Sequence, residues 1–221
     1  MQHFYGRRNP RSVSAKKRVD LYRSNFFFSE FIAYKKIRSF SKLYNNLSLE
    51  IGIGNGDNII KSSQDNNKMN GFIGCDPYLK GHYKISESLK LNQQKNILHT
   101  NLPFSRLVGF LNGLFFDKVY ILFPDPWPKE RHKKRRLINN NFVNQIYKIL
   151  KYNAKVILAT DSHEYFKSIK ADFLRNRLFK LDSYDNLIKS ESFCNLAETN
   201  YYMKAKRLGK KPIFLKFSKI K

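Results

Sequence analysis

The chain has 221 residues with 42 Lys or Arg and 17 Asp or Glu, which gives a formal net charge of +25. Its length can bury a core without disulfides, and 42% apolar with 15% aromatic residues excludes a disordered basic tail. No apolar run reaches the roughly 18 residues that a membrane span needs, and we see no secretory signal. We therefore expect a cytoplasmic protein with a polyanionic partner.

Residues 1–20 hold a basic arm without periodicity, and short helices are expected near 16–23 and 29–38. Strand and helix signals then alternate along the chain. Buried strands are expected at 47–53, 71–75, 96–99, 118–123 and 155–160. Helices are expected from about 58, near 80–93, over 137–150 and near 162–175. Two further strands, near 179–185 and 212–218, are expected to form a hairpin at one sheet edge.

This alternation predicts an α/β fold: a mostly parallel, seven-stranded sheet with an antiparallel edge and helices on both faces. We expect residues 1–40, the basic arm and its helices, to belong to the same unit as a main domain over 41–221. Ligands of such folds bind outside the carboxyl ends of the strands. The informative motifs of this chain fall at those ends.

A glycine-rich turn, LEIGIGNGD, follows the first expected strand. Gly52, Gly54 and Gly56 allow a tight turn and a close approach of backbone to a ligand. The dinucleotide fingerprint G-x-G-x-x-G needs glycine where Asp57 stands, so a nicotinamide oxidoreductase is the weakest interpretation. A plain strand-to-helix turn with an acidic N-cap is the alternative at this segment.

Two acidic residues flank this turn in the expected sheet. Glu50 ends the strand before it, where a carboxylate can face the amino group of a ligand. Asp76 ends the second strand, 20 residues after Gly56, where a carboxylate can accept the ribose hydroxyls of an adenosine. This order resembles class I S-adenosylmethionine-dependent methyltransferases. The resemblance implies S-adenosylmethionine as cofactor, and Asn101 after the third strand would hydrogen-bond its adenine edge.

A second motif, FPDPWPKERHKKRR at 123–136, directly follows the fourth strand. Its prolines stand at positions 124, 126 and 128, and they make a stiff loop that holds Asp125 and Trp127 at the strand end. Six basic residues follow in the eight positions from 129 to 136. A charge run alone indicates only a solvated face. Beside a rigid acidic loop, it favours a strip that binds the phosphates of a nucleic acid.

The sequence as a whole resembles the bacterial tRNA (guanine-N7-)-methyltransferase family of the TrmB type. The resemblance covers nearly the whole chain, and the long PDPW-basic block is its most specific part. The matching segments are FYGRR near the start, LEIGIGNG, GCDP, FPDPWPKERHKKRR, ATD at 159–161 and T-x-Y-x-x-K-A-x-R-L-G at 199–209.

The resemblance implies a role for each matching residue. Asp125 matches the catalytic acid and also lies beside the cofactor, which Glu50, Asp76, Asn101 and the turn glycines would bind. The residues that would contact the target nucleoside or close the site are Lys129, Asp161, Thr199, Asn200, Tyr201 and Tyr202. The residues that would contact RNA are Arg131, His132, Lys133, Lys134, Arg135 and Arg136.

Three positions depart from the family pattern. Asp76 stands where Glu is more common, and Asn101 stands where the family has Asp. Tyr202 stands where the family has Glu, which removes a carboxylate from the rim of the active site.

The implied activity is methyl transfer from S-adenosylmethionine to N7 of a guanine in tRNA, at position 46 of the variable loop. The basic arm, with Arg7, Arg8 and Lys16 to Arg18, would hold the tRNA body. Two alternatives stay open: an amino-methyltransferase acting on another base, and an inactive relative that only binds tRNA. We expect a monomer or homodimer with no obligate protein partner, no membrane contact and no metal, since no His shows metal-ligand spacing.

Overall fold

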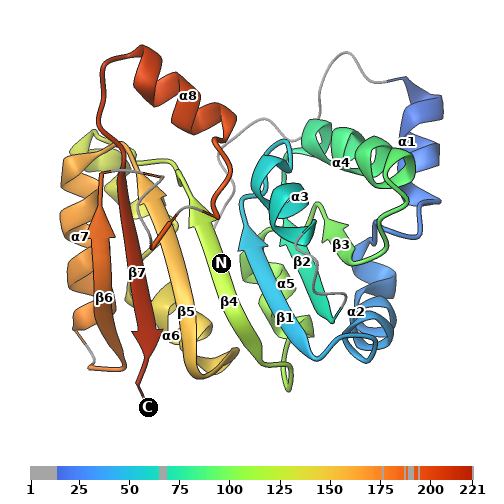
Figure 1. Ribbon diagram of the computed structural model, residues 1–221, viewed down its shortest axis with the longest axis horizontal. Coiled ribbons are helices and arrows are strands. Elements are labelled where there is room, and N and C mark those ends of the chain that lie inside the picture. Colours follow the sequence, from blue (N-terminus) through green and yellow to red (C-terminus); the bar gives the residue numbers. More distant parts are fainter. Residues whose placement is uncertain are drawn as a thin grey trace. The chain divides into compact units, whose positions relative to one another are not determined.

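The computed structural model describes residues 14–64, 69–175, 177–186, 188, 192–193 and 195–220. These residues fall into two compact units, 1–114 and 115–221, called unit 1 and unit 2 here (Figure 1). Each unit is an α/β structure built around part of a β-sheet. No helix among the described residues is both long and apolar enough to span a bilayer.

Unit 1 contains three parallel strands in the order β3-β2-β1, with pairings such as Leu49 to Ile73 and Ile73 to Leu98. Its strands are β1 (Asn46–Ile51), β2 (Asn70–Cys75) and β3 (Ile97–Thr100). Its helices are α1 (Ala15–Tyr22), the 3-10 turn η1 (Glu30–Ile32), α2 (Ala33–Ser41), α3 (Asp57–Ser63), α4 (Leu79–Leu91) and α5 (Phe104–Phe110).

The strands of unit 1 are buried almost throughout, as is usual for parallel strands that are covered on both faces. Side chains of α3 and α4 pack on them in a cluster that closes around the glycine-rich turn. Its buried members are Ile53, Ile59, Phe72, Ile85, Leu89 and Ile97. The turn therefore rests on a rigid apolar base.

Unit 2 contains four strands in the order β4-β5-β7-β6, of which β4 and β5 are parallel and β7 is antiparallel to both its neighbours. Its strands are β4 (Phe116–Leu122), β5 (Leu150–Thr160), β6 (Phe179–Asp185) and β7 (Ile213–Lys219). Its helices are the 3-10 helix η2 (Glu130–Arg135), α6 (Asn140–Lys148), α7 (His163–Leu174) and α8 (Asn200–Arg207).

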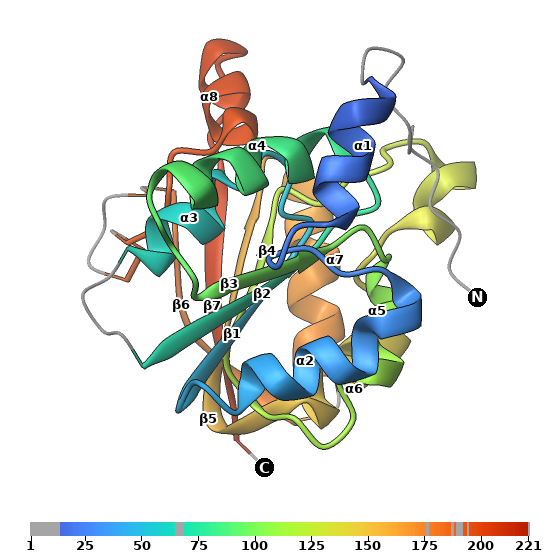
Figure 2. The same ribbon diagram turned by 90° about the vertical axis from the view of Figure 1, so that its right-hand side faces the viewer.

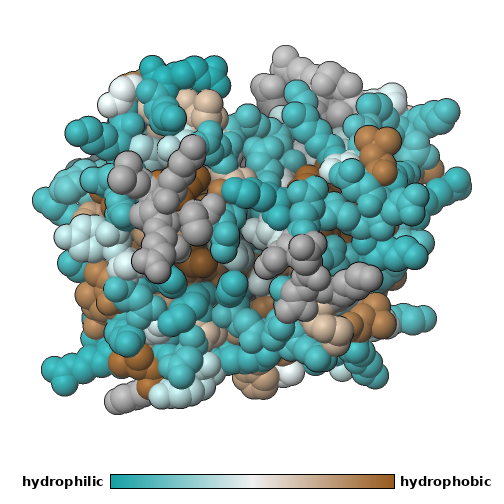
Figure 3. Space-filling view, in the orientation of Figure 1, coloured by the Kyte–Doolittle hydropathy of each residue, from teal (hydrophilic) through white to brown (hydrophobic). Residues whose placement is uncertain are grey.

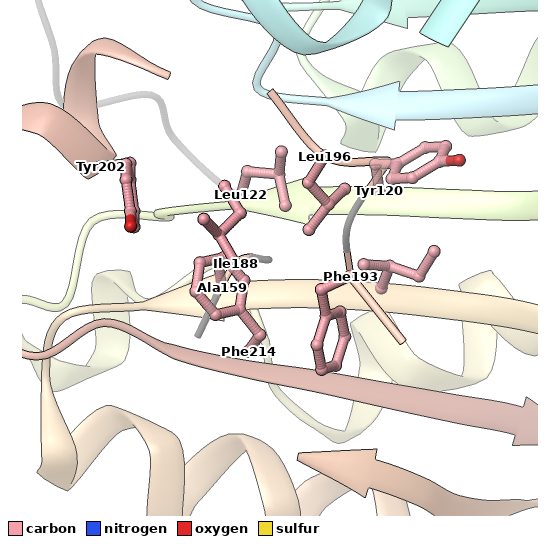
Figure 4. Close-up of a cluster of buried hydrophobic side chains, with 9 residues drawn as sticks. Tyr120, Leu122, Ala159, Ile188, Phe193, Leu196, Tyr202 and Phe214 are labelled. Atoms are coloured by element: carbon pink, nitrogen blue, oxygen red, sulfur yellow. The ribbon is translucent and has the colours of Figure 1, made fainter. Parts of the chain in front are cut away.

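The sheet of unit 2 has one face covered by residues from beyond β6 and from α8 (Figure 4). Phe193 and Phe214 pack ring to ring there, with their centroids 5.6 Å apart. The buried members of this cluster are Tyr120, Leu122, Ile157, Ala159, Ile188, Phe193, Leu196, Tyr202 and Phe214.

Most elements agree with the sequence prediction to within a few residues, but three helical segments differ. The helix expected over 137–150 is shorter, because Asn139 caps its start by accepting a hydrogen bond from the Phe142 amide at 3.1 Å. Leu150 already pairs with Phe116 as the first residue of β5. The sequence analysis also missed α5 and α8, whose seven and eight residues are too short for a clear period.

Candidate functional site

The glycine-rich turn of unit 1 runs through left-handed backbone. Gly52, Gly54 and Gly56 have φ angles of +83°, +51° and +83°, which residues with a Cβ rarely adopt. A Cβ on Gly52 would have no atom within 4 Å, so the turn borders open space there. A Cβ on Gly56 would lie 2.3 Å from Ile85, so the other side of the turn is packed tightly.

Gly81 in α4 completes this turn, and the sequence analysis missed it. A Cβ at this position would lie 1.6 Å from the carbonyl oxygen of Gly54. Helix α4 therefore touches the turn through its backbone. The available signal was a glycine inside an otherwise good helix, which costs about 1 kcal/mol against Ala and so needs a packing reason.

Asp76, directly after β2, fixes the shape of the turn from the other side. One carboxylate oxygen accepts a hydrogen bond from the Gly54 amide at 2.9 Å, and the other accepts from the Tyr78 amide at 2.8 Å. The side chain remains half-buried. The same carboxylate that is expected to bind a ribose therefore also orders the turn.

A buried hydrogen-bond chain anchors the backbone at Asp76. The carbonyl of Asp76 can only accept, so His82 donates to it from Nε2 at 2.7 Å and must accept at Nδ1. His99 therefore donates from its Nδ1, 2.9 Å away, and accepts at Nε2 from the Ser86 hydroxyl at 3.3 Å. Burial lowers the pKa of both rings, that of His82 to about 4, so the chain is neutral and complete near neutral pH.

Glu50 at the end of β1 is only 4% exposed. It accepts a hydrogen bond from the side-chain amide of Asn58 at 2.9 Å. Burial raises the pKa of Glu50 to about 8, the Asn58 hydrogen bond opposes the shift, and Asp57 and Asp76 add to it. Asn58 lies in the first turn of α3, and sequence reasoning did not single it out.

These residues fit the group that the sequence analysis expects. The turn offers open space at Gly52, and carboxylates stand at the ends of β1 and β2. Asn101, half-buried directly after β3, adds an amide at the end of the third strand. Carboxylates suit both ribose hydroxyls and a cationic ligand, while the left-handed glycines leave room for a close backbone approach.

In unit 2, the PDPW loop begins where β4 ends. Phe123 and Trp127 both have left-handed backbone, with φ angles of +54° and +42°. Such angles at large side chains are strained and gather at functional sites. Asp125 between them is exposed, and partial desolvation raises the pKa of its carboxyl.

Arg136 and Arg135 hold this loop. Arg136 is buried, and it donates from Nε to the carbonyl of Pro126 at 2.8 Å and from Nη2 to Glu164 at 3.0 Å. The Arg135 guanidinium lies over the ring of Trp127, 5.1 Å from its centroid. The sequence predicts that both residues contact RNA. In the structure, their side chains contact residues of the PDPW loop.

The other cations of this segment divide into paired and outward-facing residues. Lys133 pairs with Glu164 at 2.6 Å and also with Glu130. His132 lies edge-on to Trp127, and partial desolvation together with its cationic neighbours lowers the pKa of this imidazole. The cations that are exposed and form no ion pair within the described part of the chain are Lys129, Arg131 and Lys134.

Asp161, after β5, already has a cationic partner in unit 2. Lys210, which follows α8, contacts its carboxylate at 2.6 Å. Thr199 accepts a hydrogen bond from the Tyr202 amide at 3.2 Å and so forms the N-cap of α8. Lys210 is a neighbour of the candidate site that the sequence analysis did not name.

Tyr202 belongs to the apolar core of unit 2. It is 8% exposed, and its ring lies at one end of the buried cluster, 6.1 Å from that of Phe214 (Figure 4). The Lys206 ammonium lies 5.4 Å from the centre of the Tyr202 ring. Asn200 and Tyr201 are exposed on the same helix. At position 202, where the family pattern has Glu, this chain therefore has an aromatic ring that packs α8 onto the core of unit 2.

Part of the expected site lies outside the described residues, namely Arg7 and Arg8 of the basic arm. Lys16 to Arg18 lie in α1 and are exposed. Among the described residues, no group of three or more His, Cys, Asp or Glu is placed to hold a metal ion.

Comparison with known proteins places residues 44–215 in a family described as "Putative methyltransferase". The tRNA (guanine-N(7)-)-methyltransferase of Neorickettsia sennetsu is 36% identical over 167 residues, covering 75% of this chain and 71% of its own. The enzyme of that name from Wolbachia pipientis wMel is 32% identical over 172 residues, covering 78% and 74%. That from Mycoplasmopsis pulmonis is 32% identical over 177 residues, covering 80% and 86%.

Solved structures share the fold at lower identity. The 16S rRNA methyltransferase KamB superposes with a TM-score of 0.62 at 14% identity, covering 88% of this chain and 95% of its own. An antibiotic-related methyltransferase gives a TM-score of 0.59 at 20% identity, covering 85% and 94%. Together with the seven strands and the antiparallel β7, these structures confirm the expected class I methyltransferase fold.

Proposed function

Because the chain belongs to the tRNA (guanine-N7-)-methyltransferase family, we propose that it methylates N7 of a guanine in tRNA with S-adenosylmethionine as donor. The observation that carries this proposal is the similarity to curated tRNA (guanine-N(7)-)-methyltransferases at 32–36% identity, together with the methyltransferase family match over residues 44–215. That segment contains both the glycine-rich turn with its two acids and the PDPW-basic segment.

Unit 1 supplies the residues that would hold the cofactor. Asp76 would accept the ribose hydroxyls, Glu50 would face the amino group, and Asn101 would face the adenine edge. The turn backbone at Gly52 would approach the ligand closely, since no side chain occupies the space beside it. The hydrogen bonds of Asp76 to the turn hold its carboxylate in place before any ligand binds.

Held by Glu50, Asp76 and Asn101, S-adenosylmethionine would supply an electrophilic methyl group on a cationic sulfur, and the sulfur would leave as a neutral thioether when the exposed lone pair of guanine N7 bonds to the methyl carbon. N7 carries no proton, so the protein needs no strong base. Its residues instead orient the guanine and favour the charge that develops on the ring. Carboxylates do both, because they accept hydrogen bonds from the N1–H and amino edge of guanine.

In unit 2, Asp125 and Asp161 are the carboxylates assigned to the guanine. Asp125 stands on a loop whose backbone is fixed by Arg136 at Pro126. Asp161 is paired with Lys210, so guanine binding there would compete with that ion pair. Lys129 would contact the guanine O6 or a phosphate, and the exposed Arg131 and Lys134 would contact the RNA backbone.

We further propose the variable-loop guanine at position 46 as the target, and the cytoplasm as the site of action. A test uses unmodified tRNA transcript and isotopically labelled S-adenosylmethionine, followed by digestion and mass spectrometry. Label in 7-methylguanosine, lost when the transcript carries adenine at position 46, is the expected result. Label in N6-methyladenine or N4-methylcytosine would contradict the target atom, and tRNA binding without label would favour an inactive relative.

The role of Asp125 has its own test. Asp125→Asn keeps the shape of the side chain and removes its charge. We expect turnover to fall by about 100- to 1000-fold, in line with the loss of one electrostatic contact in a transition state. Full turnover with unchanged base specificity would show that Asp125 has no part in the reaction.

A further inference from the structure

Helix α2 of unit 1 has two faces of opposite character. Its buried face presents Ala33, Ile37 and Phe40 at helical spacing. The opposite face continues from η1 before the helix to its C-cap, and its members recur every three or four residues. These residues, called the α2 stripe here, are Phe31, Tyr34, Lys35, Arg38 and Lys42.

The two aromatic side chains of the α2 stripe lie in water. Phe31 is 101% exposed and Tyr34 is 63% exposed. Single exposed apolar residues are ordinary, but here two rings and three cations share one helix face. The Arg38 guanidinium also lies over the Tyr34 ring, 5.3 Å from its centroid. Figure 2 shows α2 from its outer side, and most of the surface in view in Figure 3 is teal, which agrees with the charge of the chain.

The segment around the stripe is predominantly positive. Residues 14–43 contain eight Lys or Arg and two Asp or Glu. Glu30, the acid next to Phe31, is bound by Arg106 at 2.6 Å, so its charge is already offset. A cationic face that carries exposed rings suits a polyanion with flat, stackable groups.

We propose that the α2 stripe binds the RNA substrate away from the methylated base. Lys35 and Lys42 would contact phosphates, and Phe31 and Tyr34 would stack on unpaired bases, which is how cationic grooves with aromatic residues hold single strands. The inference rests on the proposed tRNA substrate. The stripe precedes residues 44–215, so it lies outside the segment that the family match covers.

Charge and pattern favour RNA over other partners of this surface. A helix that lies on a membrane needs a broad apolar face, and α2 already uses its apolar residues in the core of unit 1. The centre of a protein interface is depleted in charge, whereas cations make up three of the five stripe residues.

The test compares tRNA affinity of wild type and of Phe31→Ala/Tyr34→Ala by filter binding with an unmodified transcript. Stacking contributes about 1–3 kcal/mol per base, so we expect binding to weaken by roughly 10-fold or more. Lys35→Ala/Lys42→Ala should reduce the slope of log K against log salt by about 1.4–1.8. Tyr152→Ala, which removes a ring that is 70% exposed in β5 of unit 2, is the matched control and should bind like wild type.

The outcomes separate this inference from the proposed function. Wild-type protein that binds tRNA through the stripe but forms no 7-methylguanosine would contradict the function alone. Normal methylation with unchanged tRNA affinity in both stripe variants would overturn the inference alone. Stripe-dependent sedimentation with anionic lipid vesicles, or a stripe-dependent dimer, without a change in tRNA affinity would overturn it in favour of those partners.

Discussion

Two loops follow parallel strands in this chain, and each turns through left-handed backbone. After β1, the left-handed positions are all glycines, Gly52, Gly54 and Gly56. After β4, they are Phe123 and Trp127. The first loop belongs to the candidate cofactor site and the second to the candidate nucleoside site.

The difference shows two ways to hold a functional loop. Glycine adopts left-handed backbone without strain, so the shape of the first loop depends on what packs against it: the backbone of α4 at Gly81 and the carboxylate of Asp76. A larger residue costs about 1–3 kcal/mol there, so the second loop depends on side-chain contacts, among them those of Arg135 and Arg136. The first loop should therefore lose its shape when an atom is added at a packed glycine. The second loop should lose its shape when a supporting side chain is removed.

Gly81→Ala tests the first half of this comparison and should have the largest effect. The new methyl group would lie 1.6 Å from the Gly54 carbonyl oxygen, which is backbone and cannot move aside cheaply. We expect the affinity for S-adenosylmethionine to fall by more than about 100-fold, with a loss of roughly 1–3 kcal/mol in the free energy of unfolding. Isothermal titration and urea unfolding measure the two effects.

Gly109→Ala is the matched control, since this glycine also lies inside a helix, α5. A Cβ there meets no atom within 4 Å. We expect unchanged cofactor affinity and a gain of up to about 1 kcal/mol from helix propensity. Equal behaviour of the two alanine variants would contradict the close packing of α4 on the turn.

Tyr202→Glu restores the residue expected from the family and tests how far unit 2 depends on its side chains. Because position 202 lies in the apolar cluster beside Phe214, a carboxylate there would be desolvated, and Lys206 one helical turn later would offset only part of that cost. We expect a loss of about 2–4 kcal/mol in stability and no gain in turnover. Tyr202→Phe keeps the packing and should stay near wild type in thermal unfolding. Higher turnover in the Glu variant would show that the position acts on the substrate.

Arg136→Ala removes the residue that holds the PDPW loop, and Lys134→Ala removes an exposed neighbour as its control. Because Arg136 is buried and bonds Pro126 and Glu164, we expect its loss to cost roughly 2 kcal/mol and to lower turnover, with cofactor affinity unchanged. Lys134→Ala should leave stability unchanged and weaken tRNA binding, with the salt slope smaller by about 0.7–0.9. If both variants lose only tRNA affinity, Arg136 binds RNA after all.

The sequence predicted where the strands fall along the chain and the positions of the two loops, because apolar runs and glycine or proline signals are local; it did not predict the order of the strands in the sheet. It also placed Glu50, Asp76 and Asn101 at strand ends, where the structure has them. The sequence analysis did not identify Gly81 and Asn58, because their roles arise from contacts that α4 and α3 make near the turn. Such contacts have no signature in residue spacing.

The cations from 129 to 136 mark a sharper limit. The sequence presents them as one run, and their spacing does not distinguish Arg136, which is buried, from Lys134, which is exposed. The burial of Arg136 depends on its contacts with Glu164 and Tyr165, which lie in α7 almost thirty positions later. Tyr202 is a second example. The family motif predicts this residue at the rim of the active site, whereas in the structure its ring packs beside Phe214 in the core.

The smallest expected effect is a pH dependence of cofactor binding at the first loop, because Glu50 beside that loop titrates near neutral pH. Glu50 has a pKa of about 8 in the folded protein, against 4.5 for an ordinary glutamate. The ligand-free protein therefore keeps a proton that the unfolded chain releases, and its stability decreases as the pH rises from 4.5 to 8. A cationic amino group at Glu50 favours the ionised carboxylate, so cofactor binding should release this proton.

Because the ionised fraction of a carboxyl with a pKa of about 8 rises from roughly one eleventh at pH 7 to one half at pH 8, the affinity for S-adenosylmethionine should rise about fivefold over that range and about twofold more at higher pH. Titration calorimetry at pH 7 in buffers of different ionisation heat counts the released protons. Glu50→Gln keeps a neutral partner for Asn58 and leaves the titration of the ligand's own amino group unchanged. The difference between the two proteins therefore isolates the carboxyl. Equal proton release in both would mean that Glu50 stays protonated in the complex, and that Asp76 alone provides the acidic contact of the first loop.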